Sequence, residues 1–243
     1  MKKLFILTIF SCIALLGISQ EKCIKIDSEN FEIGQSHNKT IIDFKEFANI
    51  NGISNESIRT FLSTYQDFNF PVGFDKTKFI ELYLSSLNDL KNASYDFRNF
   101  GHYNYSVILS NSIKAIINDI ETIKNYDLFS KDLDELKIFY YDKLNCDEYK
   151  IFTSVIAVSR NSAKLWMPVD LGGKGFVFSN RANDVGRRWW QNALIGDCSA
   201  SAQFMLGVGV GGAVSLSLIP GTNGLFFAAW GIAAGIGSAC AAL

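Results

Sequence analysis

The sequence predicts an all-α fold: a helical bundle, then a short glycine-rich loop or hairpin, then a hydrophobic helical hairpin rich in glycine and alanine. The chain contains only three prolines, and its apolar residues recur at the spacing that lines one face of a helix. The last 46 residues carry no charged side chain. Four parts are expected: a signal peptide at 1–19, a helical domain at 20–165, a connecting segment at 166–197 and the hairpin at 198–243.

The N-terminus has the features of a secretory signal peptide. Lys2 and Lys3 form a basic region, an apolar run follows at 4–16, and the small residues at 17–19 suit a signal peptidase. The alternative is a lipoprotein signal with Cys12 as the acceptor, although the apolar run continues past that residue. Either signal predicts an exported protein, located outside the cell or in the cell envelope.

The helical domain contains a succession of predicted helices with apolar stripes. The clearest spans 105–125, where Leu109 and five isoleucines fall on one face. Ser54, Asp75 and Ser130 are expected to cap other helices. The stripes indicate ordinary core faces, or alternatively surfaces that shelter the apolar tail. The core positions expected on the other helices include Ile41, Phe44, Ile58, Phe61, Leu62, Ile80, Leu84, Leu133, Leu136, Phe139, Tyr140, Leu144, Ile151, Phe152 and Val155.

The connecting segment contains a glycine-rich stretch at 172–175, which indicates a loop or a short hairpin around a turn. It is not a phosphate-binding loop, because no glycine precedes it at the required spacing and Gly175 follows Lys174 where Ser or Thr is needed. Nucleotide binding is therefore not expected.

The same segment ends with paired arginines and paired tryptophans immediately before the uncharged tail. Indole rings settle at the headgroup level of a bilayer and guanidinium groups bind lipid phosphate, so we expect a membrane-interface role. The alternative is a cation–π cluster on the surface of a soluble bundle. The residues concerned are Arg187, Arg188, Trp189 and Trp190.

The tail consists of two uncharged runs, 199–219 and 224–243, separated by a turn at Pro220-Gly221. A helix of about 20 residues is about 30 Å long, the thickness of the bilayer core, so each run is long enough for a transmembrane helix. Each run also contains a GxxxG pattern, which lets helix backbones approach closely. The helix-packing residues are Gly207, Gly211, Gly231 and Gly235, and the aromatic residues expected to contact lipid are Phe204, Phe226 and Phe227.

Four cysteines remain after removal of the signal peptide, and an even number in an exported chain favours disulfides. A hairpin that turns at Pro220 brings its two ends to similar heights, so we expect a Cys198–Cys240 disulfide there. The remaining pair, Cys23–Cys146, is expected to close the helical domain. The alternative is four buried free thiols.

Charge and composition exclude several functions. Without Lys2 and Lys3, 21 basic residues face 24 acidic ones, and this net charge of −3 does not suit a nucleic-acid partner. The two histidines, His37 and His102, stand in polar surroundings typical of loops, and no cysteine or histidine spacing fits zinc. No catalytic residue, metal or cofactor is expected, since Cys198 has no identifiable base.

The tail resembles the glycine-zipper peptides of class II bacteriocins, because it is uncharged, rich in glycine and alanine, and preceded by a cationic aromatic segment. The net charge of 174–243 is +2, similar to that of such peptides. Gly172-Gly173 is similar to the site after which bacteriocin leaders are cut, although the helical domain is far longer than a leader. The resemblance implies a membrane-active tail.

The leading hypothesis is therefore a secreted, bacteriocin- or toxin-like protein, not an enzyme, whose hairpin inserts into a target lipid bilayer. Self-association through the glycine faces would accompany insertion. One alternative is an envelope protein of unknown binding role that the hairpin anchors. The other is a soluble helical protein in which the hairpin is the buried core.

Overall fold

The protein is described by a computed structural model at residues 32–65, 77, 80, 81, 84, 106–176 and 189–207. Over these residues the structure is all-α and contains no strand, which confirms the predicted helical bundle. The helices are α2 (Glu32–Asn51), α3 (Asn55–Thr64), α5 (Val107–Thr122), α6 (Tyr126–Tyr140), α7 (Cys146–Trp166) and α8 (Trp189–Gly207), with a 3-10 turn, η2 (Val169–Leu171).

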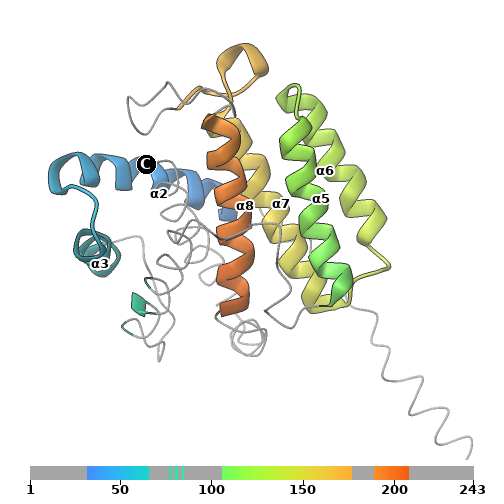
Figure 1. Cartoon of the computed structure of the whole chain (residues 1–243), viewed down its shortest axis with the longest axis horizontal. Coiled ribbons are helices and arrows are strands. Elements are labelled where there is room, and N and C mark those ends of the chain that lie inside the picture. Colours follow the sequence, from blue (N-terminus) through green and yellow to red (C-terminus); the bar gives the residue numbers. More distant parts are fainter. Residues whose placement is uncertain are drawn as a thin grey trace, which may run out of the picture.

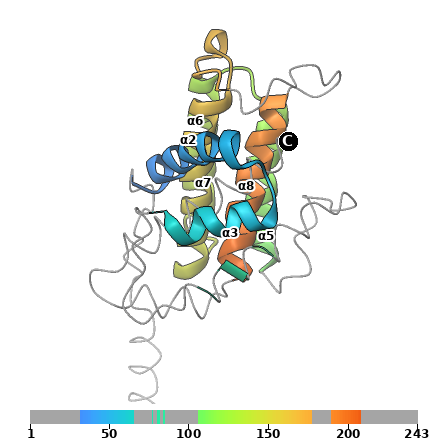
Figure 2. The same ribbon diagram turned by 90° about the vertical axis from the view of Figure 1, so that its left-hand side faces the viewer.

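Helices α5, α6, α7 and α8 stand side by side, and α2 and α3 lie on one side of this layer (Figure 1). The view in Figure 2 shows α2 running across the direction of α7 and α8. Helix α7 contacts α2, α5, α6 and α8, so it is the central element. Its burial agrees, because fourteen of its residues are buried.

The direction of each helix defines two ends of the bundle. Near the start of α8, Gln191 Nε2 donates to the carbonyl of Ile120 near the end of α5, at 3.1 Å. Arg160 of α7 donates to the carbonyl of Ser130 in the first half of α6 at 2.9 Å, and pairs with Asp134 near its middle at 2.7 Å. The end of α5, the start of α6, the end of α7 and the start of α8 therefore lie together, at what we call the Trp189 end. The opposite end, where α8 finishes, is the Gly207 end.

Polar side chains set the starts of these helices. Asn125 Oδ1 accepts from the Leu128 backbone N–H at 2.9 Å, so α6 begins at Tyr126 and Ser130 lies inside it. The predicted cap at Ser130 is wrong, because asparagine one turn earlier satisfies the free N–H groups of the first turn. Ser130 instead accepts a hydrogen bond from Arg160.

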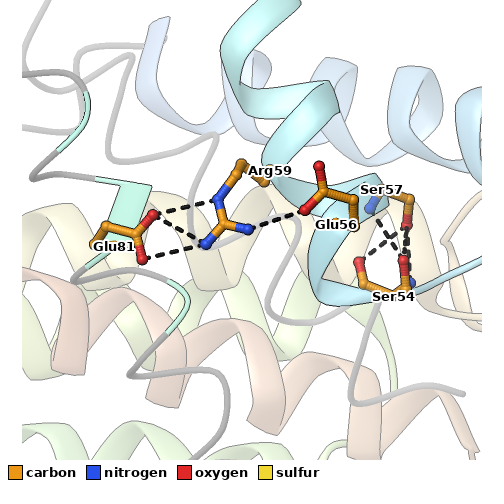
Figure 3. A network of polar contacts seen from close by, with 5 residues as sticks. All are labelled: Ser54, Glu56, Ser57, Arg59 and Glu81. Carbon is orange, nitrogen blue, oxygen red and sulfur yellow. Dashed lines mark hydrogen bonds and ion pairs between the residues drawn. The ribbon is translucent and has the colours of Figure 1, made fainter.

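Helix α3 begins with a capping box. Ser54 Oγ accepts from the Ser57 N–H at 3.0 Å, and Ser57 Oγ accepts from the Ser54 N–H at 2.8 Å (Figure 3). Arg59 on the same helix lies between Glu56 and Glu81, with both carboxylates at 3.0 Å. Because these side chains are exposed, the two ion pairs contribute little to stability.

The segment after α7 forms a compact turn, as the glycine-rich stretch predicts. Gly172 has a φ of 93°, a left-handed conformation that favours glycine, and its carbonyl accepts a hydrogen bond from Lys164 Nζ at 2.8 Å. A Cβ at Gly173 would lie 2.0 Å from the Met167 carbonyl oxygen, so only glycine fits. The turn returns the Phe176 ring to the Trp166 ring, with centroids 5.5 Å apart.

Helix α8 corrects the predicted organisation of the tail. It runs without a break through residue 198, where the hairpin was expected to begin. No helix among the described residues is long and apolar enough to cross a membrane, so a transmembrane helix beginning at residue 199 is wrong for this part of the chain. The physical reason is that α8 carries Asp197 at its centre and is covered by the bundle. The second run, 224–243, lies outside the described residues.

The predicted cysteine pairing also needs correction. Cys198 is a free, fully buried thiol, so the Cys198–Cys240 disulfide is wrong. Its side chain packs against α7 within the core, where no second sulfur of the described residues reaches it. Cys23 lies outside the described residues, so the Cys23–Cys146 pairing stays a prediction.

Candidate functional site

A polar junction lies inside the bundle where α2, α7 and α8 meet. It consists of His37 and Asn38 from α2, Ser162 and Trp166 from α7, and Asp197 from α8. His37 Nε2 and Asp197 Oδ1 are 3.3 Å apart, and both side chains are 0% exposed. Among the described residues, no other acidic, basic or histidine side chain is buried to this degree. Such groups are rare in a core unless they are paired, so the junction is the most specific polar feature of the fold.

Asp197 is held from two sides. Trp166 Nε1 donates to its Oδ2 at 2.7 Å, and His37 faces its Oδ1. The contact with His37 is an ion pair without hydrogen-bond geometry, and neither of its two atoms has a hydrogen-bond partner in the described part of the chain. Losing either partner would leave a buried charged or polar group uncompensated, which is strongly destabilising.

The neighbouring amide determines the protonation of His37. Asn38 Nδ2 donates to the Asn161 carbonyl at 2.9 Å, which turns Asn38 Oδ1 toward His37 Nδ1 at 3.0 Å. An oxygen in that position can only accept, so Nδ1 carries a proton. The Nδ1 side of the ring thus faces the Asn38 amide, and Nε2 on the opposite side faces Asp197 Oδ1. Pairing of this kind makes complete burial of the two side chains tolerable.

Small polar side chains continue from the junction along α7 and α8. The hydroxyls of Ser154 and Ser199 are buried, and no residue that the structure describes pairs with them. Cys198 lies beside Ser159, and burial, together with the charge of Asp197, raises the pKa of its thiol to about 12. The thiolate is the reactive form, so Cys198 is unreactive while α8 is docked.

The chemistry of the junction includes the residue types of a serine hydrolase. Ser162 Oγ lies 3.5 Å from His37 Nδ1, and the opposite ring nitrogen faces Asp197. All three side chains are fully buried, so this conformation gives a substrate no access to the hydroxyl. In addition, His37 Nδ1 is protonated and faces Asn38, so it does not act as a base toward Ser162. The arrangement can hold helices together, which is the role we assign to it.

The prediction that His37 lies on a polar loop is wrong. His37 lies inside α2, on the face that packs against α7. The buried residues of α2 recur mostly every three or four residues. The apolar stripe predicted from Ile41 onward could therefore have been extended by one turn, to His37, from the sequence alone. These buried residues are His37, Thr40, Ile41, Phe44 and Ala48.

The residues expected at a membrane interface divide between the core and the rest of the chain. Trp190 is 2% exposed and belongs to the core, so it does not face lipid in this structure. Trp189 is half-buried, with its ring 6.1 Å from the Trp166 ring. Phe204 and Gly207 lie on α8, but their side-chain surroundings are outside what the structure describes. Outside the described residues lie Arg187, Arg188, Gly211, Phe226, Phe227, Gly231, Gly235 and Cys240.

Comparisons with known proteins identify no relative: no family model, curated protein or solved structure matches this chain. Among the described residues, no group of three or more histidine, cysteine or acidic side chains could hold a metal ion.

Proposed function

We propose that the protein is an exported carrier whose helical bundle encloses the beginning of its uncharged C-terminal segment and releases that segment to a lipid bilayer. The observation that carries the proposal is the burial of the first tail residues. Cys198, Ser199, Ser201 and Ala202 are all 0% exposed. Helices α5 and α7 pack against the helix that contains them, and α2 reaches it through His37.

The polar junction supports a docked state that can be undone. A buried ion pair gives little net stability compared with apolar residues of the same size, yet it fixes one arrangement of the helices. Here the pair and the Trp166 donor connect α8 to α2 and α7 at one level. Breaking these contacts while α8 stays buried is costly, so α8 is expected to be either docked or fully released.

Thiol labelling of Cys198 tests the proposal on the full mature chain. The buried thiol has a pKa of about 12, so a maleimide reagent should react with it very slowly in the docked state. We expect phosphatidylcholine vesicles to accelerate labelling at Cys198 at least about tenfold, because release of α8 exposes the thiol. Mass spectrometry of the fragment that contains Cys198 measures the reaction, since other cysteines in the chain can also react.

Two controls define the limits of this assay. Guanidinium-unfolded protein gives the labelling of a fully exposed Cys198, and a Cys198→Ala variant gives the background. If the thiol reacts equally slowly with and without vesicles while the protein binds them, α8 stays docked and the proposal is wrong.

A second candidate function has an observation in its favour. Trp190, Ala193 and Leu194 at the start of α8 are as deeply buried as the first tail residues, which is typical of a permanent core helix. In that case the bundle is a stable scaffold of an envelope protein, and vesicles leave Cys198 protected.

A further inference from the structure

Of the ten large apolar side chains that the described residues expose, five lie at the Gly207 end of the bundle. Helices α5 and α6 are antiparallel, so the start of α5 and the end of α6 lie together at this end. Val107 is 74% exposed, Ile138 77% and Phe139 57%, and Ile108 and Tyr141 are also exposed. Large apolar side chains that gather at one end of a bundle mark an interaction surface more often than scattered ones.

The same end is where the chain continues into the uncharged segment. Gln191 near the start of α8 lies level with Ile120, and both helices run about 1.5 Å per residue. Because the two helices are antiparallel, residue 205 of α8 lies level with the first turn of α5. The 36 residues after Gly207, none of them charged, follow from this point.

The charges around this surface nearly cancel, and a lysine ammonium group lies over one of its aromatic rings. Lys143 Nζ lies over the Phe139 ring, and the Tyr141 and Tyr149 rings stack edge to face with centroids 5.3 Å apart. Aromatic rings next to lysine are typical of the membrane–water boundary. Between residues 135 and 150 the charged residues are Lys137, Lys143 and Lys150 against Glu135, Asp142, Asp147 and Glu148.

We infer that the Gly207 end is the surface with which the protein contacts a lipid bilayer, with Ile138 and Phe139 as its main contacts. This inference rests on the proposed function and names the part of the bundle that meets the lipid. Apolar side chains enter the boundary between headgroups and acyl chains, and Gly207, which the uncharged segment follows in sequence, lies at the same end. Because nearby charges almost cancel, contact depends on apolar burial and not on anionic lipid.

The test compares vesicle binding by two double variants of the full mature chain. Ile138→Ser with Phe139→Ser alters the Gly207 end. Leu128→Ser with Val169→Ser alters residues of similar exposure, 46% and 74%, at the Trp189 end. Fully burying one such side chain accounts for about a tenfold change in affinity or more. We expect at least about tenfold weaker cosedimentation with phosphatidylcholine vesicles for the first variant, and about wild-type binding for the second.

Further outcomes separate this inference from the proposed function. Vesicle binding through apolar side chains should change little between 0.1 and 1 M salt, because salt screens only the interactions between charges. A large loss of binding at high salt would contradict an apolar contact. Equal binding of both variants, with Cys198 still labelled in the presence of vesicles, would overturn the lipid surface and keep the proposed function. If the Ile138→Ser and Phe139→Ser double variant sediments differently from the wild type without vesicles, yet binds vesicles as the wild type does, the Gly207 end is instead a self-association surface.

Discussion

The His37–Asp197 pair allows a quantitative test of the polar junction. Asp197→Leu leaves the His37 imidazole and the Trp166 N–H buried without the carboxylate that faces both of them. Breaking a buried pair in this way lowers the free energy of unfolding by about 3–5 kcal/mol. His37→Leu is expected to cost a similar amount, because Asp197 is then left with Trp166 as its only donor among the described residues.

The double variant should cost less than the sum of the two single ones. Replacing both His37 and Asp197 by leucine removes the uncompensated charge and leaves mainly the Trp166 N–H without a partner, a loss of about 1–3 kcal/mol. The interaction energy between the two positions is therefore expected to exceed about 2 kcal/mol. Neighbouring residues in one network show interaction energies of this order.

Urea unfolding of the four proteins, followed by far-UV circular dichroism and tryptophan fluorescence, gives the required free energies. Asp170→Asn is a suitable control, since Asp170 is exposed and such changes stay within about 0.5 kcal/mol. If the losses at His37 and Asp197 add to within about 0.5 kcal/mol, the two side chains do not interact energetically, and the junction does not hold α8.

Two further predictions concern the helix interfaces. Burial and the nearby Asp132 raise the pKa of Asp119 to about 6, above the value near 3.9 in the unfolded chain. The stability that the protonated carboxyl contributes is therefore present below pH 4 and is lost as the pH rises through 6. Asp119→Asn should remove this decline in the midpoints of urea unfolding measured between pH 4 and 7. Gly34→Ala should cost about 1–3 kcal/mol in urea unfolding, because its Cβ would lie 2.8 Å from the Ala157 carbonyl oxygen of α7. Asn49→Ala, exposed on the same helix, should have little effect, and an equal effect of both changes would contradict close packing of α2 on α7.

The stripes of apolar residues predicted most of the body of the fold, but Phe139, expected on the core face of its helix, is 57% exposed. Helix α5 buries Leu109, Ile113, Ile116, Ile117 and Ile120, five of the six residues named in its stripe, and the sixth, Ile123, is buried just beyond its end. This succeeds because spacing along a helix decides which side chains share a face. The start of α6 was misplaced, because Asn125 and Ser130 are both good caps and spacing does not choose between them.

Helix α8 shows where such prediction stops. A helix that is apolar or small all round is buried either in lipid or in protein, and composition alone does not distinguish the two. Gly, Ala and Ser allow close backbone approach in both settings. What distinguishes them here is Asp197, whose partners His37 and Trp166 are 160 and 31 residues away in sequence. The pairing of groups so distant depends on tertiary packing, so the polar junction could not be predicted.

The buried thiol of Cys198 has a consequence for how the chain matures. In an oxidising compartment, where the proposed export would take the chain, thiols pair with each other, and the four cysteines left after signal-peptide removal allow three pairings. Once α8 is enclosed, Cys198 is withdrawn from that exchange, because it is inaccessible and its thiolate is scarce. In an exported chain, early enclosure of α8 would therefore keep Cys198 out of wrong disulfides, and a chain that closes slowly would leave this thiol open to mispairing.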